Sequence, residues 1–278
     1  MKRLLSIEWS KIFYYKSARV FTILYFTLLI LLGVVISFIK PNLNGLEFNL
    51  RELGYFNFPY IWQNLTYLFA IGKIFLGVIL IMNITNEYTN GTLKQNLIDG
   101  LSKNEFLSSK FLTVLVLTLA STAFLFVIAL ILGLTLSSTE FGFYEGIEYL
   151  GAYFIKLLFF FTFCTFLGVL LRKSVFALLG FFVWWIVEGI ISVVEVLIKL
   201  NITDTGKNPA DITLISNYLP LGSSSSLIPL TKFDIAGILM NKSAFVYSPV
   251  DKSYLFTCIL YTIVFALLSK WILKKRDL

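Results

Sequence analysis

Six unbroken apolar runs constrain the fold of this chain more than any other feature. They cover residues 20–39, 67–84, 111–136, 151–171, 175–197 and 254–273. About 20 apolar residues in an α-helix cross the roughly 30 Å hydrocarbon core of a bilayer. Strands of a membrane barrel alternate over only about ten residues, so runs of this length indicate helices. The sequence predicts an all-α integral membrane protein, a bundle of six transmembrane helices that forms a single domain over residues 1–278.

Lys and Arg residues at the ends of these runs and in the segments between them gather on one side of the predicted topology. They are Lys2, Arg3, Lys11, Lys16, Arg19, Lys94, Lys103, Lys110, Arg172, Lys173, Lys270, Lys274, Lys275 and Arg276. The short loops on the other side hold only Lys40 and Arg51. Basic residues of short loops stay on the cytoplasmic side, so both termini are predicted to be cytoplasmic. The bias toward Phe, Ile, Lys and Asn favours a bacterial cytoplasmic (inner) membrane.

Several kinds of chemistry are not expected. The net charge of +7 follows from the topology, so it does not indicate a nucleic-acid partner. The chain has no His, and its two cysteines, Cys164 and Cys258, lie inside predicted spans. A metal site, a disulfide and catalytic residues are therefore not predicted. The Gly-Lys pair at 72–73 lacks the flanking residues of a P-loop, so the chain is expected to be no enzyme and to bind no ATP or other cofactor itself.

Residues 1–19 are predicted to form an amphipathic helix on the membrane surface. Apolar residues recur there at helical spacing, and the polar residues occupy the other faces. The apolar set is Leu5, Trp9, Ile12 and Phe13, and the polar set is Lys2, Glu8, Lys11 and Lys16. Two roles remain open for this helix, an anchor that fixes the topology and a contact with a partner.

Residues 85–110 form a loop on the predicted cytoplasmic side with two helix-start signatures. Thr92 with Gln95, and Ser102 with Glu105, fit the capping box, in which a hydroxyl and a carboxylate or amide satisfy amides at a helix start. Gly100 is a predicted helix stop. The apolar side of the short helix between them consists of Leu93, Leu97, Ile98 and Leu101. Such a helix suits docking into a groove of another protein, or packing under the bundle.

The same loop resembles that of type-2 ABC exporter permeases. The likeness is carried by Glu87, by Gly91-Thr92, by Ser102-Lys103-Asn104-Glu105 and by Lys110, which leads into a span. The order of parts is also similar: an amphipathic start, six spans, and a large outer segment before the last span. The resemblance therefore covers the architecture of the whole chain and a motif between Glu87 and Lys110.

This resemblance implies that the chain is the permease subunit of an ATP-driven ABC transporter that exports a substrate. The implied partners are an ABC ATPase subunit, which would hold ATP and Mg, and a second permease subunit in a homodimer or heterodimer. In that family the loop forms a coupling helix on the ATPase, which implies such a role for Glu87, Gly91, Thr92 and Glu105. Two alternatives remain open, an ion-gradient-driven secondary transporter and a nontransporting membrane anchor of an ATPase-driven envelope complex.

Charged residues within the runs are the remaining candidates. Charge in a bilayer is costly and normally faces a partner or a cavity, as expected for Lys73, Glu188 and Glu195. Glu188 and Glu195 are seven residues apart, hence on one helix face, and Lys73 is expected to pair with Glu188. Lys156 and Glu195 are expected to reach the interface from span ends. These residues form either a polar path for substrate or packing contacts.

The outer segment, residues 199–253, is expected to form short re-entrant or surface helices over the outer mouth of the bundle. It contains four prolines and a run of serines between apolar patches. These residues interrupt helices and favour turns, so the segment is not expected to supply a further span.

Overall fold

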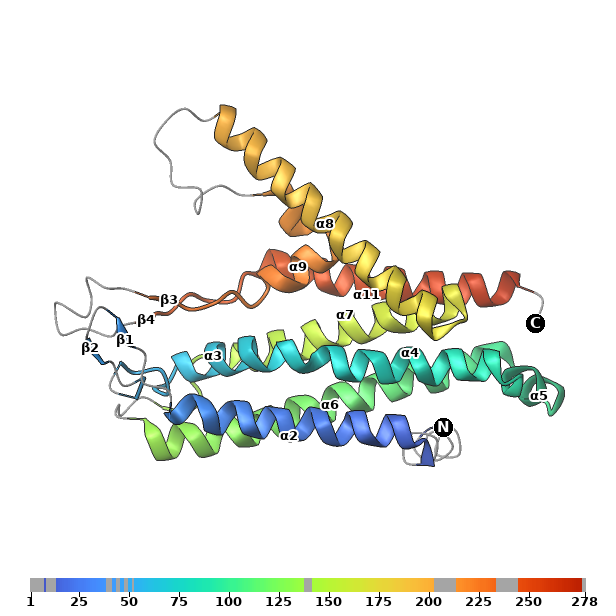
Figure 1. Ribbon diagram of the computed structural model, residues 1–278, viewed down its shortest axis with the longest axis horizontal. Helices are drawn as coiled ribbons and strands as arrows, with labels where there is room; N and C mark the ends of the chain where they lie inside the picture. The colour runs from blue at the N-terminus through green and yellow to red at the C-terminus, as the bar shows by residue number, and fades with distance from the viewer. Residues whose placement is uncertain are drawn as a thin grey trace.

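The computed structural model describes residue 8 and residues 14–38, 42–43, 46–47, 50–51, 53–137, 142–202, 214–233 and 245–276. Within these residues, six helical segments are long and apolar enough to cross a membrane. They are Ala18–Ile36, Tyr60–Thr89, Lys103–Leu136, Glu148–Leu171, Ser174–Lys199 and Lys252–Lys275. All of them except Ser174–Lys199 lie alongside one another (Figure 1). The predicted all-α, six-span membrane bundle is confirmed.

The elements follow one another along the chain with short connections. In order they are α2 (Lys16–Phe38), β1 (Asn42–Leu43), β2 (Leu46–Glu47), α3 (Tyr60–Phe69), η1 (Ala70–Gly72), α4 (Lys73–Thr89), α5 (Thr92–Ile98), α6 (Lys103–Leu136), α7 (Glu148–Leu171), α8 (Ser174–Ile202), η3 (Ile215–Tyr218), α9 (Pro220–Ser226), β3 (Lys232–Phe233), β4 (Phe245–Val246) and α11 (Lys252–Lys275). The strands form two antiparallel pairs, β1 with β2 and β3 with β4.

Helix α7 forms the centre of the bundle. It packs against α4, α6, α8 and α11. Its sequence is apolar on every side, which is typical of a helix surrounded by other helices. Phe159, Phe160, Phe161 and Phe163 are all buried. These rings fill the core with edge and stacked contacts, such as Phe159 on Phe163, instead of facing lipid.

Two of the spans begin well before the apolar runs in the sequence. The predicted second run, 67–84, lies within a continuous helical segment that starts at Tyr60. Polar residues at its beginning are buried inside the protein, where Gln63 donates to the Pro229 carbonyl and Asn64 to the Tyr55 carbonyl. Because both amide nitrogens find acceptors within the protein, the helix does not need lipid-compatible side chains there. The third span likewise begins early, at Lys103.

Helix α8 leaves the bundle at an angle, and η3 and α9 of the outer segment lie beside it (Figure 1). Both η3 and α9 contact α8, and α9 also packs on α11 and α7. Pro220 is the first residue of α9, where its missing amide costs no hydrogen bond. The expectation of short helices in this segment is confirmed by η3 and α9, between Ile215 and Ser226. Residues 203–213 and 234–244 of the segment lie outside the described part.

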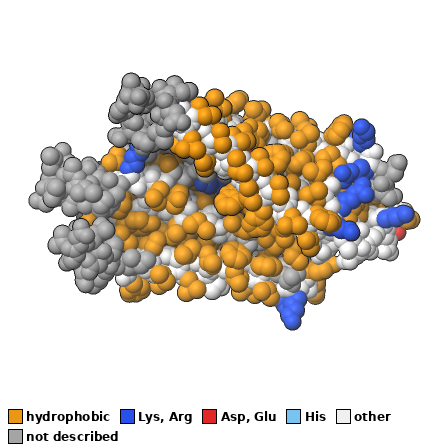
Figure 2. Space-filling view, turned by 45° about the horizontal axis from the view of Figure 1, so that its top comes forward, with side chains coloured by type: hydrophobic (Ala, Val, Ile, Leu, Met, Phe, Trp, Pro, Cys, Tyr) orange, Lys and Arg blue, Asp and Glu red, His pale blue; other side chains and the backbone are white. Residues whose placement is uncertain are grey.

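Basic side chains gather at one end of the apolar surface (Figure 2). We call this the basic end, and it holds Arg172, Lys173, Lys274, Lys275 and Arg276. Helix α2 begins there, α11 ends there, and the short helix α5 projects from it (Figure 1). The strand pairs and α9 lie toward the opposite end.

Candidate functional site

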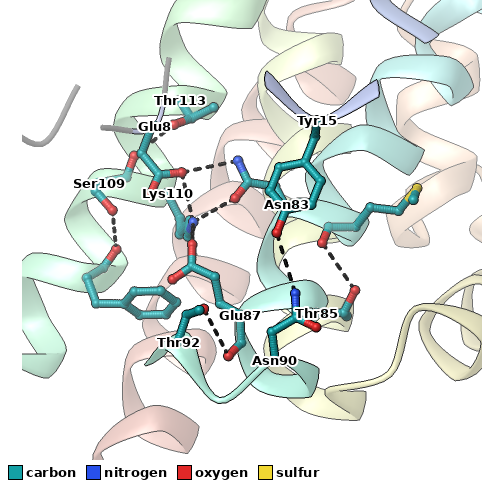
Figure 3. A network of polar contacts seen from close by, with 12 residues as sticks. Glu8, Tyr15, Asn83, Thr85, Glu87, Asn90, Thr92, Ser109, Lys110 and Thr113 are labelled. Atoms are coloured by element: carbon teal, nitrogen blue, oxygen red, sulfur yellow. Dashed lines mark hydrogen bonds and ion pairs between the residues drawn. The ribbon is translucent and has the colours of Figure 1, made fainter. Parts of the chain in front are cut away.

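Four polar side chains meet at the basic end and form what we call the polar cluster, consisting of Glu8, Asn83, Glu87 and Lys110 (Figure 3). The Lys110 ammonium donates to Glu8 Oε2 at 2.8 Å, to Asn83 Oδ1 at 2.7 Å and to Glu87 Oε1. Asn83 Nδ2 in turn donates to Glu8 Oε2 at 3.1 Å. Lys110 thereby uses every donor of its ammonium group.

The polar cluster is closed off from solvent. The side chains of Glu8, Glu87 and Lys110 are 4%, 5% and 2% exposed. A buried ion pair is tolerated only when good hydrogen bonds repay the loss of hydration, and here each charge faces an opposite one. Removing one member therefore costs far more than removing a surface ion pair. The cluster fixes three parts of the chain to each other: the segment before α2, the end of α4 and the beginning of α6.

Helix geometry brings these side chains together. Asn83 and Glu87 are four residues apart on α4, so they project from one face. Lys110 lies two turns into α6, and its ammonium lies 5.2 Å from the centroid of the Phe106 ring one turn earlier. Asn90, at the end of α4, also donates to the Tyr15 hydroxyl at 3.4 Å. This second contact again links α4 to the chain just before α2.

The start of α6 is set by the capping box predicted from the sequence. Ser102 Oγ accepts from the Glu105 amide at 3.2 Å, and Glu105 Oε2 accepts from the Ser102 amide at 2.9 Å. The prediction for Ser102 and Glu105 is confirmed. Glu105 is exposed, so its carboxylate reaches solvent while it caps the helix.

The other predicted capping box, Thr92 with Gln95, is wrong. Gly91 occupies the N-cap of α5 with φ +68, a left-handed conformation that glycine adopts without strain. This turn places Thr92 inside the helix, and its hydroxyl points back to the Glu87 carbonyl at 3.5 Å. Gly91 and Thr92 therefore shape the turn between α4 and α5.

Helix α5 ends where the sequence predicts. Gly100 has φ +98, the Leu101 amide donates to the Asn96 carbonyl at 2.9 Å, and the Gly100 amide donates to the Leu97 carbonyl at 3.2 Å. This is the Schellman pattern of a glycine-terminated helix, and it confirms Gly100 as the stop.

Three of the four residues predicted to form the apolar side of α5 face the bundle together, and the fourth does not. Leu93 is 2% exposed, and Leu97 and Leu101 pack against the core. Ile98, in contrast, is 78% exposed at the end of the basic-end loop. Its inclusion with the other three is wrong, because the position next to Leu97 is rotated by about 100° around the helix. The loop thus has an apolar side that anchors it and a separate exposed isoleucine.

The expected pairing of Lys73 with Glu188 is wrong. Glu188 accepts from the Leu221 and Gly222 amides, both at 2.9 Å, and from the Trp184 indole at 2.5 Å. The first amides of α9 have no partner within that helix and carry partial positive charge, so they satisfy this carboxylate. The Lys73 ammonium lies instead 4.7 Å from the centroid of the Phe160 ring.

Glu195 and Glu188 share one face of α8, as their spacing predicts. Glu195 accepts from the Ile215 and Ser216 amides at 2.6 and 2.8 Å and pairs with Lys199 at 2.9 Å. Both carboxylates therefore hold helix starts of the outer segment, which is a packing role. The expectation that Lys156 reaches the interface is wrong, because Lys156 is 4% exposed inside α7. Glu195 lies one turn before the end of its span at Lys199, where it also holds η3.

Among the four members of the polar cluster, the sequence predicts a site role for Glu87 alone. It places Glu8 on a polar face of the first helix and Lys110 at the start of a span, and it does not single out Asn83. The available signals were the four-residue spacing of Asn83 and Glu87 at a span end, and a lysine two turns inside a capped helix. Leu5, Trp9, Ile12 and Phe13 of the predicted surface helix lie outside the described residues.

Comparison with known proteins places the chain in a family. A family model described as "Protein of unknown function (DUF2705)" matches residues 30–278. No curated protein matches the chain. The match includes the end of the first span, from residue 30 to Ile36, and all of the other five spans. It also includes α5 and every member of the polar cluster except Glu8. The chain therefore belongs to the DUF2705 family.

Proposed function

We propose that this chain is the permease subunit of an ATP-driven exporter of the ABC-2 type, coupled through α5 to a separate ATPase subunit. The observation that carries this proposal is the construction of α5. It is a short helix fixed by Leu93 on one side, and it displays Ile98 at 78% exposure on another. An exposed apolar anchor with polar neighbours suits insertion into a groove on a partner protein.

The contacts behind α5 favour transmission of movement. The Lys110–Glu87 ion pair joins α6 to α4, the two helices that flank α5. A push on α5 would therefore displace both helices together instead of bending the loop. Glu8 extends the connection to the segment before α2. Buried ion pairs held by several hydrogen bonds are stiff, and they suit a force-bearing joint better than a flexible tether does.

The structure refines the roles within this proposal. Ile98 would be the central contact, with the exposed Lys94 one turn earlier on the same helix beside it. Glu105, also exposed, caps α6 directly after the loop. Gly91 and Thr92 set the angle of the turn, and Glu87 braces it from inside. Leu93, Leu97 and Leu101 attach α5 to the bundle. ATP and Mg would bind to the ATPase, and a second permease subunit, identical or different, would complete the transport path.

The proposed orientation puts the basic end in the cytoplasm of a bacterial cell. Support comes from the Lys and Arg residues at the ends of α7 and α11 and around α5, following the positive-inside tendency of short loops. The ATPase would then meet α5 on the side of the membrane where ATP is made.

Co-purification tests the proposal. Tagged protein, Ile98→Asp and Ile215→Asp would be isolated from the native host in mild detergent, and the bound proteins identified. Ile215→Asp is the matched control, because Ile215 is 75% exposed, as Ile98 is at 78%, but lies toward the end of the bundle opposite the basic end. Recovery of a P-loop ATPase with the wild type and Ile215→Asp, and its loss with Ile98→Asp, is the expected result. Absence of any ATPase from the intact wild-type complex would favour a gradient-driven transporter instead.

A further inference from the structure

Two lysines lie inside the membrane-spanning part of the bundle, away from the basic end. Lys73 is the first residue of α4, in the interior of the span Tyr60–Thr89. Lys156 is on the third turn of α7, about 12 Å from its start at the usual helical rise. At this depth a bilayer offers no water to hydrate a charge.

The two ammonium groups belong to one region between α4 and α7. The Lys73 ammonium lies 4.7 Å from the Phe160 ring centroid, and Phe160 follows Lys156 by one turn on the same face of α7. One turn beyond Lys73, a Cβ on Gly77 would lie 2.8 Å from the Phe160 ring, so the two helices touch there. Lys73 and Lys156 therefore lie in the same region, and Cys258 of α11 lies near both.

Neither lysine has a counter-charge among the described residues. The ion pairs of that part of the chain engage Lys110 and Lys199. Glu188, the acidic residue expected to neutralise Lys73, is occupied by the first amides of α9. Lys156 is 4% exposed and makes no hydrogen bond to a described residue.

Two unpaired ammonium groups in a dry region repel each other and lack hydration. Either Lys156 stays neutral, or a third group supplies negative charge. The surroundings suit such a group. Lys73 is partly exposed, and its neighbours Ile71 and Ile74 are exposed, so an amphiphile can reach Lys73 from the lipid while its apolar part stays outside. In Figure 2, basic side-chain atoms are visible recessed in the middle of the apolar surface.

We propose that Lys73 and Lys156 form a binding site for an anionic phosphate or carboxylate group within the membrane. The anion's oxygens would accept hydrogen bonds from both ammonium groups. Phe160 forms one wall, and Cys258, whose thiol donates to Ser223 Oγ at 3.6 Å, forms a polar boundary on the α9 side. The chemistry fits an anionic lipid headgroup or a small anion. This site does not depend on the chain being an exporter.

The test measures the thermal unfolding temperature of the delipidated, full-length protein in neutral detergent. Phosphatidylglycerol, phosphatidylcholine and inorganic phosphate are titrated separately, because a ligand that binds the folded state raises this temperature. Wild type is compared with Lys156→Met, Lys73→Met and Lys73→Arg. Lys94→Met, on exposed α5, is the matched control for loss of one positive charge.

The expected result is an upward shift in the wild type with phosphatidylglycerol or phosphate and no shift with phosphatidylcholine. Lys156→Met and Lys73→Met should each weaken binding of the anion by roughly tenfold or more, as expected for loss of a charged hydrogen bond. Lys73→Arg and Lys94→Met should retain the wild-type affinity for the anion. A shift with phosphate alone identifies a small anion, and a shift that needs phosphatidylglycerol identifies a headgroup.

Two results would overturn the site. One is equal anion-dependent shifts in the wild type and both Met variants, which would place binding at the surface. The other is no shift of the wild type with either anion, which would mean that Lys156 is accommodated as a neutral amine. Lys73 is partly exposed, so Lys73→Met should disturb folding less than Lys156→Met does. The test therefore remains decisive through Lys73→Met if Lys156→Met does not fold.

Discussion

Lys110 of α6 and Glu87 of α4 form a buried ion pair directly behind α5, and Glu8 binds the same ammonium group from the segment before α2. The pair lies between the two spans that α5 connects. A displacement of α5 therefore reaches both spans through a contact that excludes water. This relationship is the structural basis of the proposed coupling role.

Substitution of Lys110 by Met should strongly destabilise the bundle. It leaves Glu8 and Glu87 buried without the ammonium that neutralises them, a loss that costs about 3–5 kcal/mol in buried pairs. The measurement is the free energy of unfolding in detergent, with Lys94→Met on exposed α5 as the control. Adding Glu87→Gln to Lys110→Met should recover part of the lost free energy of unfolding. Equal stability of Lys110→Met and Lys94→Met would refute this account of the cluster.

Gly91→Ala should loosen α5 without unfolding the spans. The residue has φ +68, and a Cβ there would meet no atom within 4 Å, so the cost is backbone strain of about 1 kcal/mol. Hydrogen exchange of the α5 amides should become faster while that of α7 stays unchanged. Gly151→Ala is the control, because that glycine lies within α7 and is equally uncrowded, and it should leave α5 exchange unaltered.

Glu188→Gln and Glu195→Gln should have separate local effects. Each carboxylate accepts amides of a different short helix, and charge-assisted hydrogen bonds of this kind are stronger than neutral ones. Glu188→Gln should speed hydrogen exchange at Leu221 and Gly222, and Glu195→Gln at Ile215 and Ser216. Each variant serves as the control of the other, and matching exchange patterns would contradict the assignment.

Cysteine labelling in intact cells should report the proposed orientation. A cysteine at Lys94 should be protected from a membrane-impermeant thiol reagent, and one at Tyr144 should react with it. Both positions are exposed, and the natural Cys164 and Cys258 are buried, so background labelling should be low. The reverse pattern would put the basic end outside the cell.

Local signals in the sequence predicted much of this fold, because they act within a few residues. The apolar runs predicted the spans, Ser102 and Glu105 predicted the start of α6, and Gly100 predicted the end of α5. The Thr92 capping box failed because Gly91 takes the N-cap in a left-handed conformation.

Tertiary partners were harder to predict. Glu8 and Lys110 are 102 residues apart, and no local pattern indicates that they meet. The Lys73–Glu188 pair failed for a related reason: the amides of α9, themselves in a distant segment, compete for the same carboxylate. Charge alone does not show which donor lies nearest.

The most direct test of the coupling role is site-specific photo-cross-linking from position 98 in living cells. A photoreactive residue in place of Ile98 should form a covalent product with a P-loop ATPase, and the same residue at position 215 should not. That product, identified by mass spectrometry, is the result this account predicts. Cross-linking of position 98 only to lipid or to proteins without a nucleotide-binding fold, in cells where the chain is intact and membrane-inserted, would contradict it.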